Sequence, residues 1–336
     1  MKKLLVVCGP TATGKTKLAL YLAKKFSGEI VSADSRQVYK KMNIGTGKDL
    51  PANTKLEIKK LGPTSTPRLV GYYSVDRTCI WGYDIASPKK EFSVSHYTKY
   101  AREIIRDIYK RNKLPILVGG TGLYIKAVVD GIETANVLKN QGLRNVLEKL
   151  SVAELFEKLS QMDSIKAASL NSSDRKNPRR LIRAIEVAQS KIINHEKIGK
   201  PSAARIIDED TKIYFIGIKT DWEALKKRIV KRVEKRISDG IEDEIRKLFS
   251  AGVTWEMQSM TSLGYRQFRE HFEGKISKEE VIKKWQSEEI KYAKRQLTWF
   301  NKEKRIKWFE VNSEKDMKSV EKEVKRWYDE KDDKKS

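Results

Sequence analysis

The sequence has little cysteine and histidine and no long apolar run. Only two of its 336 residues are cysteine and three are histidine. Cys8 lies within an apolar run, where a small buried hydrophobe is expected, and Cys79 is distant from it, so neither a disulfide nor a zinc cluster is supported. No stretch approaches the roughly 20 apolar residues that a membrane-spanning helix needs. These absences predict a soluble, cytoplasmic protein.

Acidic residues are also scarce relative to basic ones. Seventy Lys and Arg face 45 Asp and Glu, a formal net charge of +25. Such a charge attracts polyanions and makes nucleic acid the first expected partner, although a lysine-rich surface can carry the same charge without one. With 39% hydrophobic residues, the chain can form one large or two modest cores.

The first third of the chain alternates between strand and helix patterns. The apolar run 3–8 ends in a glycine-rich loop rather than a cleavage site, so it is interpreted as a strand and not as a signal peptide. Helical spacing follows over 17–25 and 95–109, and further strands are expected from Gly28 and over 115–118. These repeated units predict an α/β fold, a parallel sheet flanked by helices.

The remaining segments set the expected domain boundaries. Residues 49–92 hold four of the eight prolines and predict an irregular excursion, whereas 132–200 has helical spacing throughout and predicts a helical insertion. A strand over 212–219 and helices over 221–250 then return to the sheet. The expected domains are a core of 1–131 and 201–328 with basic C-terminal helices, an insertion of 132–200, and a disordered tail of 329–336.

The loop after the first strand carries the most specific motif. Its sequence GPTATGKT matches G-x-x-x-x-G-K-[ST] between a predicted strand and a predicted helix. Its glycines let backbone amides turn toward phosphate oxygens, Lys15 supplies a charge, and Thr16 offers a hydroxyl to Mg²⁺. The expected phosphate-binding residues are Gly9, Pro10, Thr11, Ala12, Thr13, Gly14, Lys15 and Thr16. The sheet should therefore be of the P-loop NTPase-like type.

A carboxylate opposite this loop is harder to find. An ordinary NTPase has an acidic residue at the end of another strand, but the strand 115–118 leads into Gly119-Gly120-Thr121 without one. Asp34, at the end of the second strand, is the carboxylate best placed to face the loop. It could instead be a helix N-cap or a turn residue.

Six sequence blocks together resemble the tRNA dimethylallyltransferase (tRNA isopentenyltransferase) family of bacterial type. The blocks are GPTATGKT, SADSRQVYKKMNIGTGK (32–48), PILVGGTGLYIKAV (115–128), NPRRLIRAIEV (177–187), LGYRQF (263–268) and KRQLTWF (294–300). They appear in family order and span nearly the whole chain. The family is customarily classed as ATP-binding because of the phosphate loop.

The resemblance implies a specific reaction. The dimethylallyl group of dimethylallyl diphosphate passes to the exocyclic N6 of adenine 37, beside the anticodon, in tRNAs that read codons beginning with U. Diphosphate is the leaving group held by the loop, Mg²⁺ is the cofactor, and the enzyme is a monomer that binds the tRNA anticodon stem-loop. The insertion 132–200 is then expected to bind tRNA.

The resemblance also assigns roles to individual residues. Asp34 is the general base, and the other catalytic residues are Lys15, Thr16, Thr121 and Arg232. The implied tRNA contacts are Asp34, Ser35, Arg36, Gln37, Thr121, Pro178, Arg179, Arg180, Leu181, Tyr265, Arg266, Gln267, Lys294, Arg295 and Gln296. Two alternatives stay open: Thr121 could serve only turn geometry, and Arg232, one helical turn from Arg228, could form a surface salt bridge.

Near the C-terminus, residues 291–309 interleave basic and aromatic side chains. A target adenine must leave its stack to react, and aromatic residues could hold the splayed loop. Trp299 and Phe300 could equally be the core side of an amphipathic helix.

The chain departs from the family pattern between 50 and 92, where a histidine-rich segment is replaced and Asp49-Leu50 precede Pro51. Three rivals remain: a phosphate-loop small-molecule kinase, a prenyltransferase acting on free AMP, and a non-catalytic RNA-binding protein. The high positive charge argues against the first two, and the intact Lys15, Thr16 and Asp34 argue against the third.

Overall fold

The computed structural model describes residues 1–62, 67–132, 137, 139–194 and 210–330. The chain divides into two compact units, one formed by Met1–Val128 with Ile207–Ser336 and the other by Val129–Ile206. The predicted insertion, 132–200, falls inside the second unit. Of the predicted disordered tail, 331–336 lies outside the described residues, and Asp329 is the last residue of a helix.

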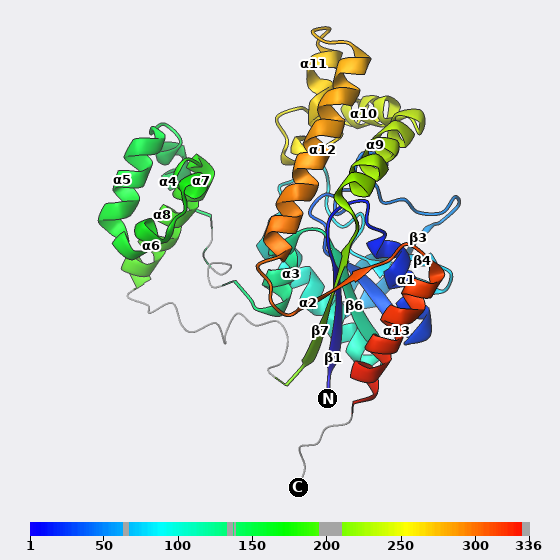
Figure 1. The fold of residues 1–336 in the computed structure, drawn as a ribbon. Coiled ribbons are helices and arrows are strands. Elements are labelled where there is room, and N and C mark those ends of the chain that lie inside the picture. The colour runs from blue at the N-terminus through cyan, green and yellow to red at the C-terminus, as the bar shows by residue number, and fades with distance from the viewer. Residues whose placement is uncertain (63–66, 133–136, 138, 195–209, 331–336) are drawn as a thin grey trace. The chain divides into compact units, whose positions relative to one another are not determined.

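The larger unit is built on one eight-stranded sheet (Figure 1). Its strands are β1 (Lys3–Cys8), β2 (Gly28–Ser32), β3 (Leu56–Leu61), β4 (Arg68–Val75), β5 (Thr78–Trp81), β6 (Leu114–Gly119), β7 (Lys212–Lys219) and β8 (Ile306–Glu310). They lie in the order β3-β4-β5-β2-β6-β1-β7-β8. The pairs from β5 to β8 are parallel, and β3 and β4 add an antiparallel hairpin. The predicted α/β class is confirmed.

Helices cover both faces of this sheet (Figure 1). The helices of the sheet layer are α1 (Lys15–Lys25), α2 (Val94–Lys110), α3 (Gly122–Val129) and α13 (Glu314–Asp329). Leu18 and Leu22 of α1 and Val320 and Val324 of α13 share one core with alternate residues of β1. The central strands are buried on both faces, which is why they read as continuous apolar runs.

A helical extension stands at the carboxyl ends of the parallel strands (Figure 1). It contains α9 (Trp222–Ser238), α10 (Ile241–Ser250), α11 (Arg269–Phe272) and α12 (Lys278–Phe300), with two 3₁₀ turns, η3 (Gln258–Thr261) and η4 (Arg266–Phe268). Leu225 and Ile229 of α9 pack against Ala293 of α12. Ligands of open α/β sheets bind at this edge, so the extension bears on the expected site.

The smaller unit is helical. It contains α4 (Gln141–Leu147), α5 (Val152–Met162), α6 (Ser164–Ser169), α7 (Ser172–Arg175) and α8 (Pro178–Asn194). Its core includes Leu147, Leu155, Leu159, Leu181 and Ile185. The helical character predicted for this region is confirmed for the described residues.

Two segments differ from the sequence-based expectation. The segment 49–92 was predicted to be irregular, but it forms β3, β4 and β5, and Trp81 of β5 is 1% exposed. Its prolines at 51, 67 and 88 lie outside the strands, so they bound the strands rather than break them. Within 291–309, α12 ends at Phe300 and the edge strand β8 follows, which the basic-aromatic pattern did not indicate.

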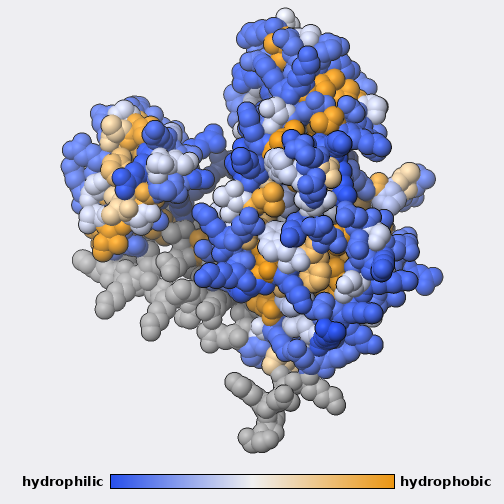
Figure 2. All heavy atoms as spheres, in the orientation of Figure 1, coloured by the Kyte–Doolittle hydropathy of each residue, from blue (hydrophilic) through white to orange (hydrophobic). Residues whose placement is uncertain are grey.

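Surface chemistry agrees with the composition. On the face shown in Figure 2 hydrophilic residues predominate, and apolar residues appear in small patches. Among the described residues, no helix is long and apolar enough to span a bilayer.

Candidate active site

The phosphate loop, residues 9–16, joins β1 to α1. Gly9 has a φ of +138°, and a Cβ there would lie 2.4 Å from the carbonyl oxygen of Ile218. Gly14 has a φ of +87° and directly precedes α1. Only glycine fits these two positions easily. The loop bends there and leads into the N-terminus of α1, whose unpaired amides favour an anion.

Hydrogen bonds inside the loop hold its curl. The buried hydroxyl of Thr13 donates to the carbonyl oxygen of Pro10 at 2.9 Å, and the Lys15 ammonium donates to the same oxygen. Thr13, Gly9 and Pro10 are therefore framework, whereas Thr11, Ala12, Gly14, Lys15 and Thr16 line the adjoining cavity.

The cavity has a volume of about 680 Å³ and lies at the carboxyl edge of the sheet. Besides the phosphate loop, its walls come from the turn after β2, a loop at 45–49, the turn after β6, and helices α9 and α12. The predicted residues that line it are Thr11, Ala12, Gly14, Lys15, Thr16, Asp34, Ser35, Arg36, Gln37, Arg232, Arg266, Arg295 and Gln296. Residues more than 280 positions apart in the sequence thus meet in one site.

Cationic side chains converge on this cavity. Arg232 of α9 donates to Thr11 Oγ1 at 2.9 Å, to the Gly47 carbonyl at 3.3 Å and to Asp49 at 2.9 Å. Burial lowers the pKa of Lys15 to about 8, and the positive charge of Arg232 is the second cause. The negative charge of Asp34 acts in the opposite direction. Closely spaced cations held apart from water form a strong anion site. Arg232 does form the salt bridge that was the alternative, with mostly exposed Asp49, but it also lines the cavity, whereas Arg228 contacts Asn312.

Asp34 is both a turn residue and a cavity residue. Its Oδ1 accepts the backbone amides of Arg36 at 2.8 Å and Gln37 at 3.4 Å, an Asx-type turn. Among the described residues, no protein donor bonds to its Oδ2. One carboxylate oxygen thus fixes the side chain and the other is available to the cavity.

Thr121 buttresses this turn rather than lining the cavity. Its Oγ1 accepts the backbone amide of Ser35 at 3.1 Å, and the Thr121 amide donates to the Ala33 carbonyl at 3.2 Å. It therefore joins the turn after β6 to the turn that carries Asp34. Its position suits an indirect role through Ser35.

Gln296 belongs to the cavity wall. It accepts the Thr11 amide at 2.8 Å through Oε1 and donates through Nε2 to the Gly120 carbonyl at 2.9 Å. It is 5% exposed and lies on the buried side of α12 with Ala293 and Phe300. In this structure Gln296 connects the phosphate loop to the turn after β6 and also lines the cavity, and its contact with tRNA stays a prediction.

Tyr265 and Gln267, two further predicted tRNA contacts, are buried. Tyr265 is 0% exposed and donates to Glu244, and Gln267 is 8% exposed and accepts the Gly264 amide at 2.9 Å. Both side chains bond to neighbouring residues of the fold, and their contact with tRNA stays a prediction. Their neighbour Arg266 is exposed and lines the cavity, so the block contributes one charged contact point and two framework residues.

Some of the remaining residues considered for tRNA contact are exposed, and others are buried. Lys294 and Arg295 are exposed, Trp299 is 45% exposed, and Phe300 is 2% exposed. In the smaller unit, Pro178, Arg179 and Arg180 are exposed, but Leu181 is 0% exposed in that unit's core. The Leu181 side chain therefore packs in the core, and its contact with tRNA stays a prediction.

Several cavity residues were missed by the sequence analysis, among them the charged residues Arg236 and Glu289. Arg236, 4% exposed, lies one helical turn beyond Arg232, and burial followed by the charge of Arg232 lowers its pKa to about 10. Glu289 of α12 lies 3.8 Å from it. The sequence could have indicated Arg236, because it follows Arg232 by four residues and so lies on the same face of a helix. No sequence signal indicated Glu289.

Comparison with known proteins identifies the family. The IPP transferase family model matches residues 77–303, and an isopentenyl transferase model matches residues 2–60. The chain belongs to the IPP transferase family. This family member is 37% identical over 334 residues to the tRNA dimethylallyltransferase of Thermoanaerobacter sp. (strain X514), covering 96% of each chain. It is 35% identical over 331 residues to that of Finegoldia magna, covering 97% of this chain and 98% of the relative.

Solved structures agree with the fold. The full-length tRNA isopentenylpyrophosphate transferase of Bacillus halodurans is 30% identical to this family member, with a TM-score of 0.67 and 97% of each chain covered. A eukaryotic dimethylallyltransferase acting on tRNA has a TM-score of 0.69 at 22% identity, with 94% of this chain and 75% of that one covered. The family and the P-loop NTPase-like fold predicted from the sequence are confirmed, and this family member is an enzyme.

Proposed function

We propose that the protein transfers the dimethylallyl group of dimethylallyl diphosphate to the N6 of adenine 37 in tRNA and releases diphosphate. The observation that carries the proposal is the meeting of Lys15, Arg232 and Asp34 at one cavity. Two of them are cations suited to a diphosphate, and the third is a carboxylate suited to accept a proton. The relatives' names supply the substrate class.

The phosphate loop and its cations act on the leaving group. As the allylic carbon–oxygen bond breaks, negative charge grows on the diphosphate. Amides fixed at the N-terminus of α1, the Lys15 ammonium and the Arg232 guanidinium stabilise that charge without reorganising. Thr11 accepts a 2.9 Å hydrogen bond from Arg232, which links the two phosphate-binding elements.

Mg²⁺ fits this site as a substrate-bound ion. Among the described residues, no group of three or more His, Cys, Asp or Glu side chains could hold a metal. Thr16 exposes its hydroxyl at the cavity, and magnesium commonly combines one or two protein ligands with substrate phosphates and water. When bound, the ion would add positive charge to the leaving diphosphate.

Asp34 acts on the nucleophile. The exocyclic amine loses a proton as it bonds to the allylic carbon, and Asp34 Oδ2 accepts that proton while Oδ1 stays fixed by the Arg36 and Gln37 amides. Arg36 and Gln37, which also line the cavity, flank the target base. The adenine reaches the cavity by leaving its stack in the anticodon loop, and exposed Lys294 and Arg295 contact the RNA backbone.

An acceptor comparison tests this function. The protein is incubated with labelled dimethylallyl diphosphate, Mg²⁺ and unmodified tRNA, and separately with AMP, or with ATP and small-molecule acceptors. Transfer to tRNA alone is expected, with preference for tRNAs that read codons beginning with U. Transfer to AMP but not tRNA contradicts the proposal, and phosphoryl transfer from ATP supports a kinase.

The role of Asp34 is tested by Asp34→Asn. An asparagine keeps the Oδ1 acceptor of the turn but cannot take the proton, so kcat should fall about 10²- to 10⁴-fold while the Kd for tRNA stays unchanged. Asp34→Ala, which also removes the turn acceptor, separates turn geometry from proton transfer. A turnover by Asp34→Asn close to the wild-type rate would assign the base to another group.

A further inference from the structure

The loop of residues 43–49 joins the two halves of the cavity. Its residues 45–49 line the wall, and the Gly47 carbonyl accepts hydrogen bonds from Gln37 Nε2 at 2.8 Å and Arg232 at 3.3 Å. Gln37 lies beside the carboxylate of Asp34, and Arg232 beside the phosphate loop. The position of this one carbonyl therefore affects both the base side and the diphosphate side.

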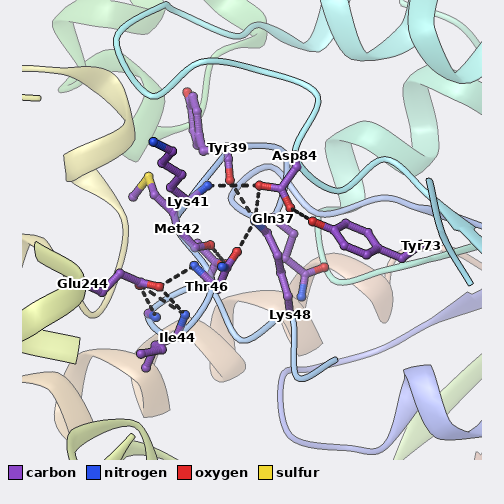
Figure 3. Close-up of polar contacts among 12 residues, drawn as sticks. Gln37, Tyr39, Lys41, Met42, Ile44, Thr46, Lys48, Tyr73, Asp84 and Glu244 are labelled. Atoms are coloured by element: carbon purple, nitrogen blue, oxygen red, sulfur yellow. Dashed lines mark hydrogen bonds and ion pairs between the residues drawn. The ribbon is translucent and has the colours of Figure 1, made fainter. Parts of the chain in front are cut away.

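The side-chain carboxylate of Glu244, on α10, binds backbone amides at the start of this loop (Figure 3). Its carboxylate accepts three consecutive amides, from Asn43 at 2.8 Å, Ile44 at 2.9 Å and Gly45 at 3.2 Å. Tyr265 adds a hydroxyl donor at 2.5 Å. Glu244 is 9% exposed, and a carboxylate so buried is tolerated because donors satisfy it.

Lys48 anchors the other end of the loop (Figure 3). Its ammonium, 3% exposed, donates to Asn43 Oδ1, to the Tyr39 carbonyl and to Asp84 Oδ1, all within 2.9 Å. Asp84 in turn accepts the Tyr73 hydroxyl at 2.7 Å. The loop is thus held between the sheet and the helical extension, and Glu244 is its attachment to the extension.

Close packing transmits any shift of the loop to the cationic side chains. A Cβ at Gly45 would lie 2.3 Å from the Tyr265 ring, and one at Gly47 would lie 2.2 Å from Arg232 and 2.0 Å from Arg236. The loop backbone therefore lies directly against the two guanidinium groups. A displacement of the 43–45 backbone cannot be absorbed without moving the Gly47 carbonyl or the side chains against it.

We propose that Glu244 is a positioning residue for the diphosphate half of the site, acting through the 43–49 loop on Arg232. Glu244 does not line the cavity, and its carboxylate works by fixing three amides whose loop presents the Gly47 carbonyl to Arg232. This role rests on the proposed use of Arg232 for the diphosphate. It gives the buried carboxylate a function in donor binding and turnover in addition to stability.

Glu244→Gln tests the proposal because it keeps the shape and removes the charge and one acceptor oxygen. We expect kcat/KM for dimethylallyl diphosphate to fall on the order of ten- to a hundredfold, the scale of a small misplacement of binding groups. The Kd for tRNA should stay within about twofold, since the exposed basic residues are untouched. Hydrogen exchange of the 43–45 amides should accelerate. Asp243→Asn is the matched control, because Asp243 is exposed in the same helical turn and forms an ion pair with Arg246.

A second variant guards against misfolding. Gly45→Ala displaces the loop against Tyr265 while the Glu244 side chain itself is kept, and it should reproduce the donor defect. Thermal unfolding sets an assay temperature at which every variant is folded. Wild-type donor kinetics in Glu244→Gln, unchanged exchange at 43–45, or an equal loss of donor and tRNA affinity overturns the positioning role. If the wild-type protein transfers no prenyl group to tRNA, the proposed function fails instead. Hydrogen exchange of the 43–45 amides still tests whether Glu244 fixes the loop.

Discussion

Replacing Arg232 by glutamine should weaken use of the prenyl donor without weakening tRNA binding. In the structure its guanidinium holds Thr11 Oγ1 at 2.9 Å and the Gly47 carbonyl at 3.3 Å, and is 25% exposed. It is therefore fixed at the phosphate loop and partly screened from water. A hydrogen bond to a charged group contributes about 1.5–3 kcal/mol, which corresponds to about a ten- to hundredfold loss of kcat/KM for dimethylallyl diphosphate.

The assay is steady-state transfer of labelled prenyl group to saturating tRNA at varied donor concentration, with tRNA affinity measured separately. Arg232→Lys should recover only part of the loss, because an ammonium lacks the planar fork of guanidinium. Arg228→Gln is the control: Arg228 lies one turn earlier on α9 and contacts Asn312 outside the cavity. Wild-type donor kinetics in Arg232→Gln, or an equal loss in Arg228→Gln, would refute the assignment of the diphosphate to this position.

Three further predictions concern charge. Because the pKa of Lys15 is lowered to about 8, its ammonium is present below that pH and lost above it, so kcat/KM for the donor should fall as pH rises through about 8; a flat profile to pH 9.5 contradicts this. Asp49→Asn frees Arg232 from an ion pair with a mostly exposed carboxylate and should lower the donor KM by about two- to fivefold, from about 0.5–1 kcal/mol; a raised KM would give Asp49 a positive role. Burial would raise the pKa of Glu29, but hydrogen bonds, first from Arg111, lower it to about 2, so Glu29 stabilises the fold above pH 4.5 and loses this contribution as pH falls toward 2. Chemical denaturation of Glu29→Gln should show a loss of about 3 kcal/mol at pH 7 that shrinks in acid, and an unchanged free energy of unfolding at pH 7 would refute it.

The fold was predictable where local patterns were strong. The buried parallel strands read as apolar runs, and the phosphate loop lies between the strand and helix that its motif requires. The hairpin of β3 and β4 was missed because the four prolines of 49–92 pointed to an irregular segment. The alternation of apolar and polar residues over Leu56–Lys59 was the available strand signal.

The site was predictable as a set of blocks, not as a set of contacts. Block membership does not tell which side of an element a residue occupies, so the blocks gave no sign that the predicted tRNA contacts Tyr265, Leu181 and Gln296 are buried. Helical spacing with Ala293 and Phe300 could have placed Gln296 on the core side of α12. No local signal marks Glu244, because its partners at 43–45 lie about 200 residues away.

Mapping the modified nucleotide tests the central claim most directly. Unmodified tRNA is treated with the protein, Mg²⁺ and dimethylallyl diphosphate, then digested to nucleosides and to fragments, and both are analysed by mass spectrometry. We predict one dimethylallyl group on the N6 of adenine 37, with one diphosphate released for each group transferred. A prenyl group at another position, or diphosphate release without a modified adenine, would contradict the account.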